Sequence, residues 1–308
     1  MKPFRFGVSV TRTTSREDWR EKARRVEQLG YGSLVIGDHL SAQLSPLPAL
    51  VAAADATSTL RLGSFVLVSD FHHPVFLAKE AATVDVLSAG RLEFGIGAGW
   101  QRRDYEMSGL PYDRARDRVS RLEEAVRLIR RLWTEATVEH KGRWFAVRSA
   151  TVLPRTVQQP HPPILIGCGG PRMLRVAAES AEIVSLNPRV THETGKLLPG
   201  QLTAATVGKK AGLAYALAAK RARRIELNVV VFEAMLTDDR RPVIEEVAQR
   251  FGCEIADIAD SPHFLIGSAA SIRDQLREQR ERFGITYYVL PYASSEHLAS
   301  VVVPLSGD

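Results

Sequence analysis

Cysteine and long hydrophobic runs are scarce in this sequence. Its 308 residues include two cysteines, Cys168 and Cys253, which are too few for a disulfide framework and favour a reducing compartment. No stretch approaches the roughly 18 uncharged apolar residues that a membrane-spanning helix needs. Near the N-terminus, Gly7 and its polar neighbours Arg5 and Ser9 interrupt the apolar residues, so a continuous signal-peptide segment is missing. We therefore expect a cytoplasmic protein with no membrane partner.

Extremes of composition are missing as well. Hydrophobic residues make up 45% of the chain and charged residues 25%, which is typical of globular proteins and excludes disorder as the dominant state. The formal net charge of +6 suits nucleic acid or a small polyanionic ligand. Because no element resembles a reading helix or an aromatic stacking platform, we expect no nucleic-acid partner. A basic run at residues 220–224 is typical of a solvated helix end or, alternatively, of a docking patch for an acidic tail.

Eight short segments, most of them apolar throughout, alternate with helical segments. Parallel strands that are buried on both faces have this composition. The alternation predicts a (β/α)8 barrel that forms a single domain over residues 1–308, with a doubly wound open sheet as the alternative. The expected strands are residues 4–10, 33–37, 62–68, 92–96, 164–167, 183–186, 225–231 and 286–290.

Helix signals separate these strands. Ser15 and Ser45 are expected to cap two helices, the second with Pro46 at its first position. The clearest helix has apolar residues three or four positions apart over residues 119–133, which form one stripe. The remaining expectations are a hairpin or extended excursion at residues 141–147, a mobile loop at 191–200 and irregular chain between 252 and 270.

The C-terminal ends of the strands, where a barrel has its chemistry, carry a short set of polar residues. Asp38 and His39 follow the second strand, and a histidine beside a carboxylate can donate a proton near neutral pH. The competing interpretation, a histidine that only caps a loop, is equally weighted. His72 and His73 could suggest a metal, but adjacent side chains of extended chain point apart and no third ligand is suitably spaced, so we expect no metal.

Two glycine-rich segments follow the fourth and fifth strands. Residues 95–100 lack the dinucleotide fingerprint, but their glycines would let a flat ligand approach the backbone, with Trp100 as a pocket wall or as simple packing. Residues 167–170 would present N–H groups at the start of a helix, and with Arg172 they predict a phosphate site; a tight turn without a ligand is the alternative. Cys168 is expected to be small filler because no base is paired with it.

These segments together resemble the bacterial luciferase-like monooxygenase superfamily, and within it the deazaflavin-dependent oxidoreductases that use coenzyme F-420. The resemblance is specific where glycine-rich and proline-rich motifs combine. It covers residues 4–190 well and the C-terminal third mainly at one motif. The matching stretches are residues 33–40 (SLVIGDHL), 62–67 with 71–74, 89–100 (AGRLEFGIGAGW), 152–154 with 158–167 (QQPHPPILIG), and 261–267 (SPHFLIG).

The resemblance implies a luciferase-like (β/α)8 barrel with insertions and a cofactor at its C-terminal mouth. It places Asp38 near the cofactor and His39 near the substrate or in the role of an acid. It also implies a non-prolyl cis peptide near Phe65–Val66, behind the ring, and a homodimer. The predicted catalytic residues are His39 and Asp38, and the predicted cofactor-binding residues are Asp38, Phe65, Val66, Gly97, Ala98, Gly99, Trp100, Gly167, Cys168, Gly169, Gly170 and Arg172.

The chain departs from the sugar dehydrogenases of that branch at two positions. Trp100 stands where some of them carry a glutamate, and their tryptophan after the Asp-His pair is missing from residues 41–44. We therefore expect a reductase of a C=C or C=N bond in a small organic substrate, with His39 as proton donor. The alternatives are an FMN-dependent monooxygenase that uses oxygen and a flavin-binding subunit without chemistry. The substrate pocket is expected to be lined by residues 41–44, 105–112 and 187–200.

Overall fold

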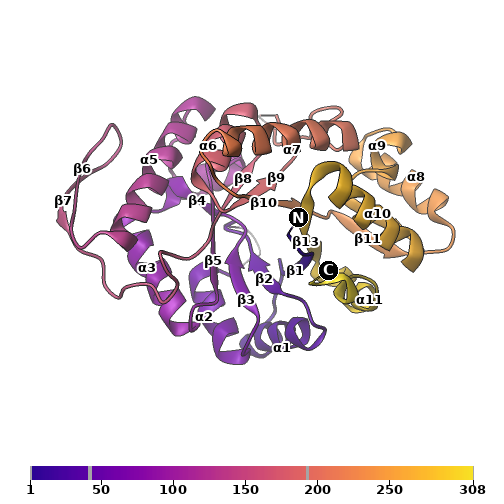
Figure 1. Ribbon diagram of the computed structural model, residues 1–308, viewed down its shortest axis with the longest axis horizontal. Helices are drawn as coiled ribbons and strands as arrows, with labels where there is room; N and C mark the ends of the chain where they lie inside the picture. The colour runs from indigo at the N-terminus through magenta and orange to yellow at the C-terminus, as the bar shows by residue number, and fades with distance from the viewer. Residues whose placement is uncertain (1, 41–43, 192–193, 308) are drawn as a thin grey trace.

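The main sheet of the computed structural model, which describes residues 2–40, 44–191 and 194–307, is a closed parallel barrel (Figure 1). Its strands are β1 (Arg5–Ser9), β2 (Ser33–Ile36), β3 (Arg61–Ser64), β4 (Leu67–Val68), β5 (Leu92–Gly97), β8 (Ile164–Cys168), β9 (Ile183–Leu186), β10 (Glu226–Val230) and β13 (Ile285–Pro291). They pair in the order β3-β2-β1-β13-β10-β9-β8-β5-β4, and pairing of β3 with β5 closes the ring. All eight predicted strand segments are present, so the barrel is confirmed and the open sheet is wrong.

The third barrel strand is divided into β3 and β4. Both halves pair with β5, with Leu62 opposite Leu92 and Leu67 opposite Ile96. From Leu62 to Leu67 the third strand advances by five residues, while β5 advances by four from Leu92 to Ile96. The third strand therefore contains one additional residue at this point. The peptide bond between Phe65 and Val66, within this gap, is cis. The resemblance placed a non-prolyl cis peptide at this position, and the structure has it there.

Helices surround the barrel (Figure 1). Ser15 caps the first one by accepting a hydrogen bond from the backbone N–H of Asp18, as predicted. Ser45 makes no such bond, because the third position of its helix is Pro48, which has no N–H to donate. No helix within the described ranges is both long and apolar enough to cross a membrane. The helices are α1 (Arg16–Gln28), α2 (Pro46–Ala56), α3 (Pro74–Leu87), α4 (Arg102–Ser108), α5 (Ala115–Thr134), α6 (Pro171–Ser180), α7 (Ala204–Ala219), α8 (Arg240–Phe251), α9 (Ile255–Ala259), α10 (Ala269–Phe283) and α11 (Tyr292–Val302), with short 3-10 turns at Ser69–Phe71 and Val303–Leu305.

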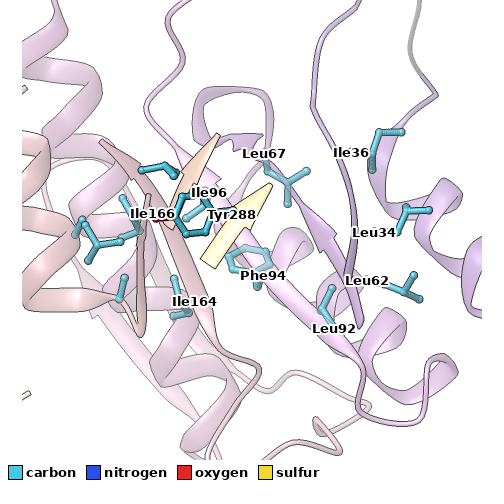
Figure 2. Close-up of a cluster of buried hydrophobic side chains, with 14 of the residues drawn as sticks. Leu34, Ile36, Leu62, Leu67, Leu92, Phe94, Ile96, Ile164, Ile166 and Tyr288 are labelled. Carbon is cyan, nitrogen blue, oxygen red and sulfur yellow. The ribbon is translucent and has the colours of Figure 1, made fainter. Parts of the chain in front are cut away.

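In β2, β8, β9 and β13, neighbouring residues enter two different clusters, because successive side chains point to opposite faces. Side chains such as Leu34, Phe94 and Ile164 belong to the large core that includes the buried faces of the helices (Figure 2). The predicted stripe of α5 is buried in the same core. A separate, smaller cluster contains the alternate positions Val35, Leu165, Ile183, Tyr287 and Val289, against which Phe65 and Val66 pack.

Two strand pairs lie outside the barrel. β6 (Val138–Lys141) and β7 (Ala146–Ala150) form the expected antiparallel hairpin, which projects from the body in Figure 1. β11 (Glu233–Leu236) and β12 (Phe264–Gly267) form a parallel pair. The expectation of irregular chain between residues 252 and 270 is wrong, because this stretch contains α9 and β12. β12 has only four residues, all buried against β11 and α8, and so short an apolar run gives no distinct period.

The N-terminal end of the barrel contains a network of opposite charges. Arg5 bonds Glu93 Oε1 at 2.5 Å and Glu226 Oε2 at 3.0 Å, and Arg61 Nε bonds Glu93 Oε1 at 2.7 Å. The guanidinium of Arg5 also lies 4.0 Å from the centroid of the Tyr287 ring. Burial alone would raise the pKa of Glu93, but the charges of Arg5 and Arg61 outweigh it and hold that pKa below its usual value. This end is filled by paired charges, so any ligand chemistry is left to the opposite end.

Candidate active site

Asp38 and His39 follow β2 at the C-terminal mouth of the barrel, but their side chains turn to different partners. Asp38 Oδ2 accepts a hydrogen bond from Val68 N–H at 3.0 Å and lies 3.0 Å from Nε2 of His72. His39 Nδ1 instead lies 2.7 Å from Oδ2 of Asp104. The carboxylate next to His39 in the sequence is therefore not its hydrogen-bond partner, because neighbouring side chains of extended chain point apart.

Asp104 is the site residue that sequence reasoning missed. It lies in the first turn of α4, and its side chain is 2% exposed. Among the described residues, its second oxygen receives one contact, a long one of 3.4 Å from Gln101 Nε2. A buried carboxylate is costly unless it is paired, so His39 is its principal partner. The two residues are 65 positions apart, which hides the pair from local patterns. The one available signal was an acidic residue at the start of a helix directly after a glycine-rich segment.

In the Asp38–His72 pair one oxygen of Asp38 makes no hydrogen bond to the described residues, and in the His39–Asp104 pair the same holds for one nitrogen of His39. Within residues 2–40, 44–191 and 194–307, no hydrogen bond reaches Oδ1 of Asp38 or Nε2 of His39, and both side chains are half-buried. Trp100 is 47% exposed, and its ring meets that of His39 edge-on with centroids 5.7 Å apart. The mouth therefore offers a carboxylate oxygen and an imidazole nitrogen beside an aromatic wall, an arrangement that suits the predicted roles of these three residues.

Glycines of β5 and β8 make room for the third strand. A Cβ on Gly95 would lie 1.9 Å from the carbonyl oxygen of Ser64, and a Cβ on Gly97 would lie 2.8 Å from Val66 Cγ2. A Cβ on Gly167 would lie 3.6 Å from the same methyl group. We expected these glycines to admit a flat ligand directly, but the space above Gly95 and Gly97 is taken by protein atoms. The surface that remains is the half-buried Val66 flanked by Gly97 and Gly167, which we call the Val66 shelf.

Helix α5 fixes the segment that follows β5. Arg118 donates hydrogen bonds to the carbonyl oxygens of Ala98 and Gly99, each at 3.2 Å. The hydroxyl of Tyr112 donates to the carbonyl oxygen of Trp100 at 2.9 Å. Because three consecutive carbonyl groups are already bonded, this wall of the mouth is preorganised, and Ala98 and Gly99 would meet a ligand through their remaining atoms.

The turn at Gly167–Gly170 leads directly into α6. Gly170 is the N-cap residue, forms no side-chain cap, and has open space where a Cβ would be. Pro171, the first helical residue, has no N–H, but those of Arg172 and Met173 have no side-chain cap in the described chain and could meet an anion, as the prediction for Gly167, Gly169 and Gly170 requires. The guanidinium of Arg172 is committed elsewhere: it donates to the carbonyl oxygen of Arg116 and to Ser120 Oγ, each at 2.7 Å, and so ties α6 to α5.

The thiol of Cys168 points away from the mouth. It is buried in the core between barrel and helices, with Sγ 3.1 Å from the carbonyl oxygen of Ser185. Burial raises the pKa of this thiol to about 12, so it stays protonated at neutral pH. The expectation that Cys168 is packing rather than a nucleophile agrees with this environment, and only its backbone could face a ligand.

The basic run at residues 220–224 lies at the other end of the barrel, because it directly precedes β10. Arg223 bonds Glu182 Oε1 at 2.7 Å, and Arg221 lies 3.8 Å from Glu179. These partners fit the solvated helix end and place the run away from the mouth. Glu182 also lines a surface hollow with Arg130 and His161, which likewise contains none of the predicted site residues. Of the predicted pocket loops, residues 41–43, 192 and 193 lie outside the described part of the chain.

Comparisons with known proteins agree with this geometry. The luciferase-like monooxygenase family profile matches residues 1–287. The F-420-dependent glucose-6-phosphate dehydrogenase of Intrasporangium calvum is 33% identical over 168 residues, 51% of this chain and 50% of that protein. The oxygenase component of the flavin-dependent trigonelline monooxygenase of Acinetobacter baylyi is 33% identical over 163 residues, 52% of this chain and 45% of that protein.

Among solved structures, the coenzyme F-420-dependent tetrahydromethanopterin reductase of Methanopyrus kandleri has a TM-score of 0.79. The superposition covers 98% of this chain and 99% of that one at 19% sequence identity, a likeness of fold alone. The chain spans about half the length of the curated relatives it matches.

Proposed function

We propose that this chain, which belongs to the luciferase-like monooxygenase family, is an oxidoreductase that transfers a hydride between coenzyme F-420 and a small organic substrate. We further propose that the reaction reduces a C=C or C=N bond. The observation that carries the proposal is the pairing of His39 with the buried Asp104 at the barrel mouth that also contains the Val66 shelf. The dehydrogenase from Intrasporangium calvum supports F-420 as the cofactor.

The residues at the mouth fit a planar cofactor that carries phosphate. The Val66 shelf would support a flat ring, and Oδ1 of Asp38 would accept a hydrogen bond from a ring N–H. The uncapped start of α6 after Gly170 would hold the phosphate. Phe65, Gly97, Ala98, Gly99 and Trp100 would contribute through backbone and ring atoms. Cys168 and Arg172 would contribute by holding the turn.

His39 is the proposed proton donor. Asp104 holds Nδ1 and would stabilise a positive charge that develops on the ring, so that Nε2 could serve the substrate. Coenzyme F-420, when bound, would supply the hydride, and the protein would supply position and the proton. Reduction of a double bond needs both, because hydride adds to one atom of the bond and a proton to the other. Trp100 would exclude water on the side of the mouth where it contacts His39.

An FMN-dependent monooxygenase is the second candidate function. The relative from Acinetobacter baylyi is named as the oxygenase component of a flavin-dependent monooxygenase, and its identity to this chain equals that of the dehydrogenase. FMN also has a planar ring and a phosphate, so the same shelf and the same turn would suit it. The two candidates differ in the cofactor that the free protein prefers.

Titration of the purified protein with F-420 and, separately, with FMN tests the proposal, with fluorescence quenching as the readout. We expect micromolar binding of F-420 and much weaker binding of FMN, followed by turnover in a screen of unsaturated substrates. A preference for FMN would reject the reductase and favour oxygen-dependent chemistry. Binding of F-420 with no turnover over a broad screen would instead indicate a cofactor-binding subunit.

A further inference from the structure

Asn187, which directly follows β9, is held by the protein at three of its four hydrogen-bonding groups. Its backbone N–H donates to the carbonyl oxygen of Cys168 at 3.0 Å. Its carbonyl oxygen accepts from Nζ of Lys210 at 2.8 Å. Its side-chain Oδ1 lies 3.3 Å from the hydroxyl of Ser185, which donates to it. Only the side-chain Nδ2 has no hydrogen bond to any residue in the described ranges.

The Asn187 amide lies next to a polar ladder inside the barrel. Oγ of Ser185, which has a single proton to donate, lies 2.7 Å from Oδ1 of Asn228 and 3.3 Å from Oδ1 of Asn187, so its contact with Asn187 is the weaker of the two. Asn228 in turn donates from Nδ2 to the carbonyl oxygen of Tyr287 at 3.2 Å. Ser185 and Asn228 are fully buried, so the ladder is shielded from water. With Oδ1 bound to the ladder, Nδ2 is directed away from it.

The free Nδ2 lies on the Val66 shelf. It is 2.9 Å from the position that a Cβ on Gly167 would occupy, and the methyl groups of Val66 lie 3.6 and 3.8 Å from that same position. Asn187 and Val66 therefore share the space that the absence of a side chain at Gly167 leaves open. A half-buried amide donor on a shelf of this kind suits a ligand atom that accepts a hydrogen bond, because an unmade bond there costs desolvation energy when a ligand covers it.

We propose that Asn187 binds a ring carbonyl oxygen of the planar cofactor through Nδ2, with Ser185 and Lys210 as positioning residues that hold its side chain and its backbone. The inference rests on the proposed function, since it requires a ring on the Val66 shelf. The rings of F-420 and of FMN both carry carbonyl oxygens at their edges, so the contact serves either cofactor. Asn187 is then a binding residue, and its contribution is measurable as affinity without turnover.

Affinity titrations of Asn187→Asp and Asn187→Ala test this inference. Loss of one neutral hydrogen bond should weaken cofactor binding about 2- to 12-fold in Asn187→Ala. Asn187→Asp has nearly the same shape but places a carboxylate against the ring oxygen, so we expect a loss on the order of 10-fold or more. Gln249→Glu, on the exposed side of α8, is the matched amide-to-acid control and should bind like the parent protein.

Ser185→Ala, which removes the orienting hydroxyl, should weaken binding about 2- to 5-fold, and it provides a second test if the Asn187 variants fail to fold. A shift of the absorption maximum of the bound cofactor in these variants would support contact with the ring. If the parent protein binds F-420 and both Asn187→Asp and Ser185→Ala bind it equally tightly, the inference is overturned and the proposed function stands. If the parent binds neither F-420 nor FMN, the proposed function and this inference both fail.

Discussion

The two ends of the barrel place polar side chains under different constraints. At the N-terminal end, Glu93 and Arg5 each have two partners of opposite charge within hydrogen-bond distance. At the mouth, Asp38, His39 and Asn187 are each fixed through one side-chain atom, while another polar atom has no bond within the described residues. Where every charged group has its partners, as at the N-terminal end, the contacts stabilise the barrel, and we call this the closed end. Where a side chain has a partner for only one of its polar atoms, as at the mouth, it is held in place while another atom can bind a ligand.

Buried charge also differs between the two ends. The carboxylates at the N-terminal end are paired with arginines, which remain charged at all ordinary pH values. The carboxylates at the mouth are paired with histidines, a side-chain type that can donate or accept a proton in catalysis. The first arrangement favours constant stability, and the second is suited to moving a proton.

The largest expected effect is on stability, at the closed end. Glu93→Ala leaves the guanidinium groups of Arg5 and Arg61 near each other without their shared carboxylate, so we expect a loss of about 3–5 kcal/mol in the free energy of unfolding. Chemical denaturation measures this value. Glu296→Ala removes the partner of Arg25 from an exposed pair and is the matched control, with a much smaller expected loss because solvent screens exposed charges. Equal losses in the two variants would show that the network does not stabilise the barrel.

The next effect is on turnover, at the mouth. His39→Ala should lower kcat about 100- to 10,000-fold, because the variant lacks the proposed proton donor. Asp104→Asn should give a smaller loss, since His39 stays in place but its protonated form lacks a countercharge. Both variants should keep the F-420 affinity of the parent protein, because neither residue borders the Val66 shelf. Reduction at full rate by His39→Ala would reject the proton donor, and the F-420 titration separates this result from loss of the cofactor.

The local parts of this structure were predictable from the sequence, and the long-range parts were not. The strands follow from apolar runs such as residues 183–186, and the cap at Ser15 follows from residue type and spacing. The position of the cis peptide at Phe65–Val66 came from the family resemblance, because nothing in the local composition requires it. The ladder below Asn187 joins strands that are distant in sequence, and no periodicity reports which polar residues of different strands will meet.

The candidate site shows the same division. Asp38 and His39 were identified from their place at a strand end. Their partners His72 and Asp104 were not, because they are distant in the sequence and only tertiary packing brings them close. The glycines of β5 were noticed but misinterpreted: they make room for Val66 of the third strand, which only the closed barrel brings beside them. Sequence patterns thus located the mouth, and tertiary packing determined which atoms remain free in it.

The smallest predicted effect concerns Lys210, the buried cation that supports the mouth without a carboxylate. Its amine is bonded to the carbonyl oxygen of Asn187 and to Oε1 of Gln201, and both acceptors are neutral. Burial therefore lowers the pKa of Lys210 to about 8, from an ordinary value of 10.5. Between these two pH values the unfolded chain holds a proton that the folded protein has released, so the free energy of unfolding should rise with pH.

Lys210→Met removes this contribution while keeping much of the side-chain volume. We expect the stability of the parent protein relative to the variant to increase between pH 8 and pH 10 by on the order of 1 kcal/mol, a value limited by solvent screening of the partly exposed amine. Denaturation at a series of pH values measures it. Arginines at the closed end do not titrate in this range, so the pH dependence should persist in Glu93→Ala. Parallel pH profiles for the parent protein and Lys210→Met would show that the neutral acceptors at the mouth stabilise the charged amine as well as water does, and the predicted effect of burial on Lys210 would be rejected.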